Sequence, residues 1–187
     1  MFEKFRADLD RYVVLRQRHW FLLLLTQQGL WAIGEYRFGY WVRNDVRIPL
    51  LRQLLKFISF VWHKVIEITT GIGIASEARI EKGLYIGHFG EIFVNDDVVM
   101  GENCNLSQGV TIGIGGRREK RGCPKIGDRV FIGPGAKLFG AIEIGNDVAI
   151  GANAVVTKDL PDNAVAVGVP ATVISYEGSK DFIFYRQ

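Results

Sequence analysis

A repeat of six residues runs through the second half of this chain. From Ile74 onward a large apolar residue returns at every sixth position, apart from a two-residue slip at Ile92 and Phe93 and an interruption between Ile112 and Ile126. The repeating apolar positions are Ile74, Ile80, Ile86, Val94, Met100, Leu106, Ile112, Ile126, Ile132, Leu138, Ile144, Ile150 and Val156. A six-residue period predicts a parallel β-helix, a solenoid in which short strands stack because none can bury its inner side alone.

A second set of residues supports this interpretation. Four positions after the large apolar residue, a small or apolar residue often returns, where the inner corner of a coil is crowded. These positions are Ala78, Val98, Cys104, Val110, Val130, Ala136, Val148 and Ala154. We therefore predict a solenoid of roughly five coils, with Cys104 in its core.

The first 70 residues have a different composition. All four tryptophans and thirteen of the 22 aromatic residues lie there, whereas nineteen of the 22 glycines lie later. Apolar residues at three- and four-residue steps predict two or three helices over residues 3–69, the second covering roughly 19–43. We divide the chain into a helical segment (1–70), a solenoid domain (71–175) with an inserted loop (113–125), and a tail (176–187).

Composition and charge limit the classes of function. A net charge of +3 with no basic, aromatic-rich stripe in the solenoid argues against nucleic acid. Two cysteines form no disulfide framework and no metal-type spacing, so we expect a cytoplasmic protein without a metal. We expect neither a signal peptide nor a membrane span. The N-terminal aromatics are interpreted as packing residues, with peripheral membrane contact through these helices as the alternative.

The hexapeptide pattern, together with the closing stretch "VVTKDLPDNAVAVGVPATVI", resembles the left-handed β-helix acyltransferases. Over residues 72–175 the likeness is to serine acetyltransferases and to the related acetyltransferases of exopolysaccharide synthesis. The resemblance implies a left-handed parallel β-helix, a homotrimer with active sites between subunits, and acetyl-CoA as co-substrate. One histidine in the solenoid argues against the zinc-dependent carbonic anhydrases of this fold, which need three.

His88, in "GLYIGHFGE", is the candidate catalytic residue. It lies two positions after Ile86, so it points outward at a turn of the coil, where it could alternatively be an ordinary surface histidine. The resemblance implies that it is the base that removes a proton from the acceptor hydroxyl, a role that suits the near-neutral pKa of imidazole. One coil on, Gln108 lies directly above or below it and is a candidate acceptor-binding residue.

Four positions depart from the serine acetyltransferase pattern. Gly73 and Gly87 stand where aspartates are expected, and Gly122 and Cys123 stand where an arginine and a histidine hold the amino-acid carboxylate. A backbone carbonyl, Glu91, or a carboxylate from an adjoining subunit would then orient His88. These losses make a sugar hydroxyl of a surface polysaccharide our favoured acceptor, with serine as the alternative and a non-catalytic binding module as a further one.

The remaining candidate positions concern the acceptor and acetyl-CoA. In the inserted loop, Arg117, Arg118 and Cys123 are candidate acceptor-binding residues, although the loop could also be a solvated surface feature. The resemblance implies that small and polar residues along the later coils bind acetyl-CoA. These are Gly113, Gly115, Gly133, Pro134, Thr157, Lys158, Gly168 and Pro170.

Overall fold

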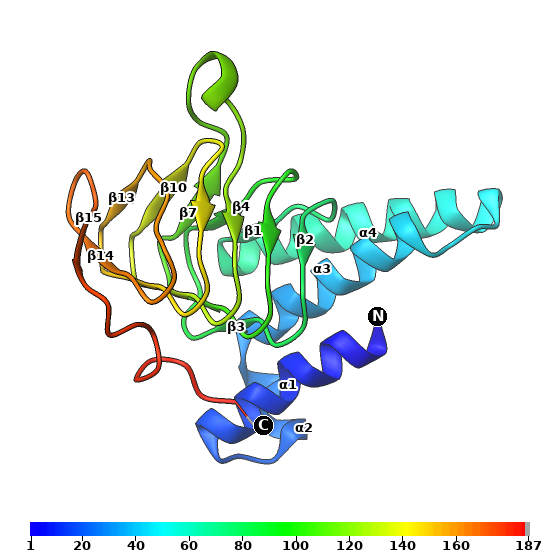
Figure 1. The fold of residues 1–187 in the computed structure, drawn as a ribbon. Helices are drawn as coiled ribbons and strands as arrows, with labels where there is room; N and C mark the ends of the chain where they lie inside the picture. Colours follow the sequence, from blue (N-terminus) through cyan, green and yellow to red (C-terminus); the bar gives the residue numbers. More distant parts are fainter. Residues whose placement is uncertain (186–187) are drawn as a thin grey trace.

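The computed structural model describes residues 1–185 as a helical segment followed by a β-solenoid. Figure 1 shows the helices gathered at the first coil, at one end of the solenoid. The helices are α1 (Phe2–Arg16), α2 (Trp20–Thr26), α3 (Gln28–Asn44) and α4 (Pro49–Thr70). The sequence predicted two or three helices over residues 3–69, and this prediction is wrong because the structure has four.

The extra break divides the helix that was predicted over residues 19–43. Gln27 has an extended conformation (φ −105°, ψ 103°) and separates α2 from α3. The Trp31 indole donates to the carbonyl oxygen of Leu24 at 2.7 Å, so a side chain of α3 satisfies one free carbonyl at the end of α2. No Gly or Pro marks this position, which is why the sequence pattern continues across it.

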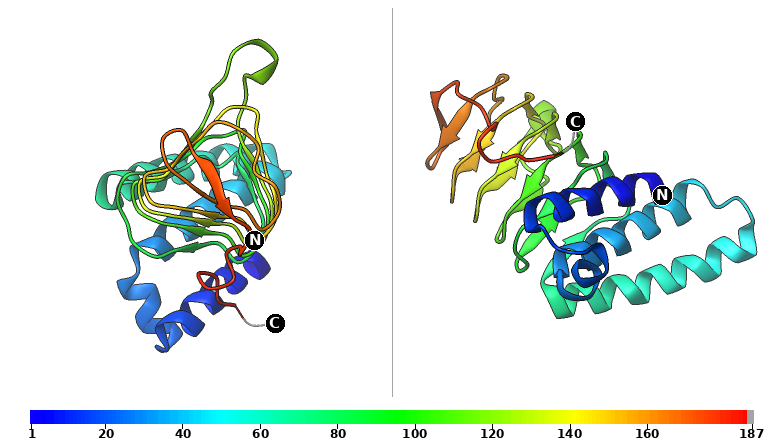
Figure 2. Two further views of the ribbon diagram at one scale, coloured as in Figure 1. Left: turned by 60° about the vertical axis from the view of Figure 1, so that its left-hand side comes forward. Right: turned by 90° about the horizontal axis from the view of Figure 1, so that it is seen from below.

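Short parallel strands form three sheets that wind into a solenoid, as expected (Figure 2). The first sheet contains β1 (Ile72–Ile74), β4 (Ile92–Val94), β7 (Thr111–Gly113), β10 (Lys137–Phe139) and β13 (Val155–Val156). The second contains β2 (Arg79–Ile80), β5 (Val99–Met100), β8 (Lys125–Ile126) and β11 (Glu143–Ile144). The third contains β3 (Tyr85–Ile86), β6 (Asn105–Leu106), β9 (Phe131–Ile132), β12 (Ala149–Ile150), β14 (Val165–Val167) and the antiparallel β15 (Thr172–Ser175).

The periodic apolar residues fill the interior of the solenoid. Every one of the thirteen positions from Ile74 to Val156 has at most 4% of its surface exposed. The small positions at the inner corners are also buried, and Cys104 is 1% exposed. The predicted fold class, a parallel β-helix preceded by α-helices, is confirmed.

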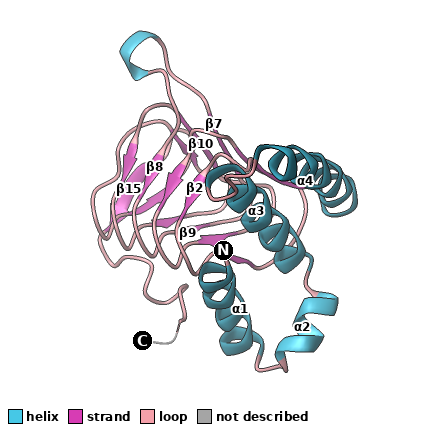
Figure 3. Cartoon of the chain, turned by 90° about the vertical axis from the view of Figure 1, so that its right-hand side faces the viewer, coloured by secondary structure: helices cyan, strands magenta, loops and turns pink. Residues whose placement is uncertain are grey.

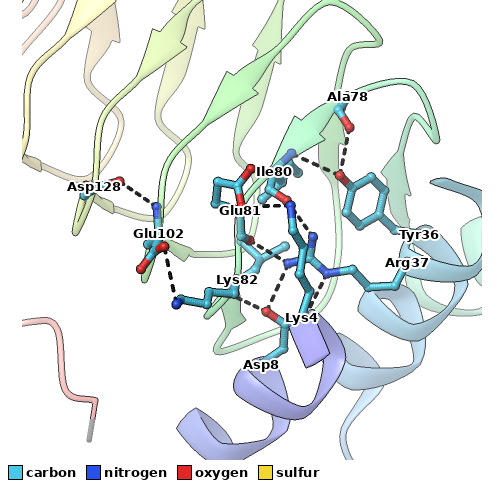
Figure 4. A network of polar contacts seen from close by, with 11 residues as sticks. Lys4, Asp8, Tyr36, Arg37, Ala78, Ile80, Glu81, Lys82, Glu102 and Asp128 are labelled. Carbon is cyan, nitrogen blue, oxygen red and sulfur yellow. Dashed lines mark hydrogen bonds and ion pairs between the residues drawn. The ribbon is translucent and has the colours of Figure 1, made fainter. Parts of the chain in front are cut away.

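Side chains of α1 and α3 close the first coil, whose strands would otherwise present unpaired backbone groups. The Tyr36 hydroxyl donates to Ala78 O and accepts from Ile80 N, and the Tyr12 hydroxyl does the same with Ile86 O and Ile86 N. Figure 4 shows the Tyr36 contacts beside the Asp8–Arg37 ion pair. The helices thus take the place of a preceding coil and hold α1 against β3.

Two helices present apolar side chains to solvent. On α2 these include Trp20 and Phe21, and on α4 they include Leu50, Leu54 and Phe57. Figure 3 shows α4 beside α3 at one edge of the helical segment, and α2 beside α1. Among residues 1–185, no helix combines the length and apolar character needed to cross a bilayer.

Two further segments leave the regular coils. The inserted loop carries the short 3-10 helix η1 (Arg118–Lys120) and projects from the solenoid in Figure 1. After β15 the chain turns back along the third sheet toward α1, shown in red in Figures 1 and 2; we call residues 176–185 the returning segment. Both α1 and this returning segment therefore reach the end of β3.

Candidate functional site

His88 lies at the corner that joins β3 of the third sheet to β4 of the first sheet. Its side chain is exposed, as the sequence predicts for an outward position. Ile86 pairs with Leu106, and Leu106 pairs with Ile132. Counting two residues further along each coil aligns His88, Gln108 and Pro134. His88, Gln108 and Pro134 therefore occupy equivalent corners of three successive coils, and Gln108 lies one coil from His88 as expected.

A groove with a volume of about 310 Å³ opens beside His88. Its floor is the outer face of the third sheet, where Tyr85, Asn105 and Phe131 follow one another in register. The other lining residues come from the end of α1, the corner itself and the returning segment: Leu15, Arg16, Gly87, Leu106, Ser107, Phe182 and Phe184. Three distant parts of the sequence thus build one groove around the candidate base.

The returning segment forms one wall of this groove. The Phe182 ring stacks on the Phe131 ring with a centroid separation of 4.6 Å. The Asn105 Nδ2 donates to Phe182 O at 2.9 Å, and the Arg11 Nε donates to Phe184 O at 3.1 Å. These contacts hold the segment against the sheet, and sequence reasoning did not place it at the site.

The end of α1 forms another wall of the groove. Arg11 donates from Nη1 to Gly83 O at 2.8 Å, and burial lowers the pKa of its guanidinium to about 10. One turn later, Arg16 donates from Nη2 to Gly87 O at 2.9 Å. Arg16 therefore lies beside the residue that precedes His88, and nothing in the hexapeptide pattern pointed to it.

A carboxylate occupies the space above Gly73, where the family pattern expects an aspartate. A Cβ atom at Gly73 would lie 3.6 Å from Oε1 of Glu67, which belongs to the last turn of α4. The Lys64 ammonium donates to Glu67 at 2.5 Å and lowers the pKa of this carboxyl group. Glu67 was not among the carboxylates considered from sequence, because a helix rather than the solenoid supplies it.

The predicted loop residues lie at another corner of the coil. The loop joins β7 of the first sheet to β8 of the second, whereas His88 joins the third sheet to the first. Arg117 and Arg118 are exposed there, beyond a stem closed by two hydrogen bonds between Gly115 and Gly122. Within one chain, Gln108 lies one coil from His88 in the register of the third sheet, whereas the loop arginines lie at a different corner.

Cys123 lies at the base of the loop. Its thiol donates to Asn95 Oδ1 at 3.2 Å, and partial burial, with Asp97 and Asp96 nearby, raises its pKa. A raised pKa leaves little thiolate at neutral pH, so Cys123 has the environment of an unreactive thiol. It too is separate from the His88 corner of its own chain.

The positions expected to bind acetyl-CoA form two rows along the solenoid. The row that continues from His88 contains Gly133, Pro134, Gly168 and Pro170. The row at the other edge of the first sheet contains Gly113, Gly115, Thr157 and Lys158. Gly113 pairs with Phe139 of the next coil. Because Leu138 pairs with Val156, Phe139 is aligned in turn with Thr157 of the coil after that.

Two of these glycines are required by packing alone. A Cβ at Gly133 would lie 2.7 Å from the carbonyl oxygen of Ile150, and one at Gly115 would lie 2.6 Å from the Cβ of Phe139. The coils could not stack this closely around larger residues. Within residues 1–185, no group of three His, Cys, Asp or Glu side chains is arranged to hold a metal ion.

Comparisons with known proteins agree with the fold and bear on the acceptor. Residues 123–158 match the family model "Bacterial transferase hexapeptide (six repeats)". A serine acetyltransferase of Synechococcus elongatus is 32% identical over 95% of this chain and 70% of its own length. The crystal structure of Neisseria gonorrhoeae serine acetyltransferase in complex with serine is 30% identical, with a TM-score of 0.78 over 93% of this chain and 69% of that one. The Brucella abortus S19 serine acetyltransferase structure with coenzyme A is 28% identical, with a TM-score of 0.81 over 95% and 68%.

These comparisons contradict the favoured acceptor. The similar proteins are serine acetyltransferases, so the prediction of a sugar hydroxyl in polysaccharide biosynthesis is wrong. That prediction rested on the four departures from the family pattern at Gly73, Gly87, Gly122 and Cys123, which lack the charged side chains expected there. No loop residue lines the groove beside His88 in its own chain, so the composition of the loop was a poor guide to the acceptor.

Proposed function

This chain belongs to the serine acetyltransferase family of acetyl-CoA-dependent acyltransferases, and we propose that it transfers the acetyl group of acetyl-CoA to the hydroxyl group of L-serine. The products are O-acetylserine and CoA. The observation that carries the proposal is the position of His88, an exposed imidazole at a coil corner beside a groove of about 310 Å³. The hydroxyl group of serine and the thioester of acetyl-CoA can come together at this corner, which lies outside the solenoid core.

In the proposed reaction, His88 acts as the general base. The serine oxygen attacks the thioester carbon while one ring nitrogen of His88 takes the hydroxyl proton. Backbone N–H groups stabilise the oxyanion of the tetrahedral intermediate. The C–S bond then breaks, and the sulfur leaves as the CoA thiol with the proton that the imidazolium returns.

We propose that the enzyme is a homotrimer with active sites between subunits. The two rows of candidate acetyl-CoA positions lie at opposite edges of the first sheet, so one chain presents them at different corners. In a trimer, the row of one subunit that contains Gly133 can face the row of its neighbour that contains Gly113. The same arrangement would carry the loop of one subunit, with Arg117 and Arg118, toward His88 of the next.

Two further proposals concern the cellular compartment and the membrane. Both cysteines are free thiols, which fits a reducing compartment such as the cytoplasm. Contact of the exposed α2 and α4 side chains with a membrane stays a hypothesis. Co-sedimentation with liposomes would test it, and absence of binding would remove it.

The experiment that tests the function is an assay of CoA release with serine and without an acceptor. The His88→Ala variant is expected to lose about 10²- to 10⁴-fold in kcat, the usual contribution of a positioned general base. His19→Asn is the matched control, because His19 is an exposed histidine that caps α2 and lies outside the groove. Full activity of His88→Ala would contradict the assignment of the base, and no serine-dependent CoA release would contradict the acceptor.

A further inference from the structure

Arg16 provides a positive charge directly beside the candidate base. It is the last residue of α1, and Gln17 follows in a left-handed conformation (φ 49°) that ends the helix. Its Nη2 donates to Gly87 O at 2.9 Å, and Gly87 precedes His88 in the chain.

Most of the hydrogen-bonding capacity of Arg16 remains available. A guanidinium has five N–H donors, and the contact with Gly87 O uses one. Arg16 is exposed, and the described residues that line the groove include neither Asp nor Glu. The groove therefore carries an unneutralised cation whose planar fork suits a carboxylate.

A second polar group on the floor of the groove points to an amino acid as the ligand. Asn105 is 6% exposed, and its Nδ2 is bonded to Phe182 O. Its Oδ1 has no hydrogen-bond partner among residues 1–185. A buried acceptor without a partner is costly. An α-ammonium group could donate to this oxygen once the Phe182 backbone, to which Asn105 is bonded, moves aside.

We propose that Arg16 binds the carboxylate of the acceptor and is the residue that selects an α-amino acid. This inference rests on the proposed function and adds to it. His88 faces the hydroxyl, Arg16 the carboxylate, and Asn105 the ammonium group, so the groove recognises all three polar groups of serine. If Arg16 binds the carboxylate, that contact does not require a charged residue at the loop positions Gly122 and Cys123.

The test compares two acceptors that differ in one group. L-serine has a carboxylate, whereas L-serinamide keeps the hydroxyl and ammonium groups and lacks that charge. We expect Arg16→Gln to raise the KM for serine about 10- to 100-fold, as loss of a charge-assisted pair predicts, with a much smaller change in kcat. The KM for serinamide, high in the wild type, should be nearly the same in Arg16→Gln.

Two other variants complete the design. Arg16→Lys keeps the charge but loses the fork, so its KM for serine should lie between those of the wild type and Arg16→Gln. Arg18→Gln is the control, because Arg18 is also exposed and lies outside the groove; its KM for serine should match the wild type. An unchanged KM for acetyl-CoA in Arg16→Gln would show that the variant folds and keeps the co-substrate site.

The outcomes separate this inference from the function on which it rests. If the wild type acetylates serine but Arg16→Gln keeps a KM for serine within twofold of it, Arg16 is not the carboxylate ligand. A rise in this KM in an Arg117→Gln/Arg118→Gln variant, with none in Arg16→Gln, would assign the carboxylate to the loop instead. If the wild type releases no CoA with serine, the proposed function fails and this inference fails with it.

Discussion

Replacement of Asp8 by alanine is expected to destabilise the protein more than any change at its surface ion pairs. The Asp8 carboxylate accepts two hydrogen bonds from Arg37, at 2.9 and 3.1 Å, and a third from Leu84 N at 2.7 Å. The two side chains are 0% and 4% exposed. Arg37 also donates to the carbonyl oxygens of Ile80 and Glu81, so this ion pair joins α1 and α3 to the first coil (Figure 4).

The magnitude follows from what the substitution leaves behind. Asp8→Ala buries the Arg37 charge without its counterion and removes the acceptor of Leu84 N. Breaking a buried ion pair from one side costs about 3–5 kcal/mol. For a chain of this length, 1 kcal/mol corresponds to about 2–4 °C in Tm, so we expect Tm to fall by about 6–20 °C.

Thermal unfolding followed by circular dichroism at pH 7 measures this loss, at one fixed protomer concentration because assembly also affects Tm. The control is Lys4→Ala, which breaks the Lys4–Glu81 pair (2.8 Å; side chains 34% and 52% exposed) between the same helix and the first coil. An exposed pair contributes about 0–1 kcal/mol, so Tm should fall by less than about 4 °C. If Asp8→Ala lowers Tm no more than Lys4→Ala does, the role assigned to the buried pair is refuted.

Two further predictions concern titratable side chains. The Glu35 carboxylate, 3.0 Å from His63 Nδ1, raises the pKa of His63, so the protonated pair stabilises the fold fully below the unfolded-state pKa of about 6.5 and this contribution is lost as pH rises through the folded pKa. The Tm advantage of the wild type over His63→Gln should therefore be larger at pH 5.5 than at pH 8.5, and a pH-independent difference would contradict the pairing. Burial raises the pKa of Cys104 to about 12, whereas Cys123 is partly exposed. In the folded protein at pH 8, iodoacetamide should thus label Cys123 slowly and should label Cys104 only after unfolding, as mass spectrometry would measure. Rapid labelling of Cys104 in the folded protein would refute its burial.

The solenoid could be predicted from the sequence because each coil repeats the same local constraint. An apolar residue at every sixth position identifies the inward side chains, and all thirteen are buried. The same register placed His88 outward at a corner and Gln108 one coil away, as the structure has them. Where no repeat exists, the prediction was poorer: the break at Gln27 depends on its extended backbone and on the bond from the Trp31 indole to Leu24 O.

The groove could not be predicted because its walls come from distant parts of the chain. Arg16 and Gly87 are 71 residues apart in sequence, and Asn105 and Phe182 are 77 apart. Neither α1 nor the returning segment contains a motif that marks it as part of a site. Their positions follow from contacts such as the stacking of Phe182 on Phe131 and the hydrogen bonds of Tyr12 with the first coil.

The two motif losses that misled the acceptor prediction share one explanation in the structure. Gly73 lacks the expected carboxylate, yet the Glu67 carboxylate from α4 lies 3.6 Å from where a Cβ at Gly73 would be. The loop lacks the expected carboxylate-binding cation, yet Arg16 from α1 lies at the His88 corner. In both cases a helix brings a group of the missing charge to this end of the solenoid: Glu67 lies over Gly73, and Arg16, which we propose as the carboxylate ligand, lines the groove beside His88. A missing motif residue is therefore weak evidence for a changed substrate when another segment can bring the same group to the same place.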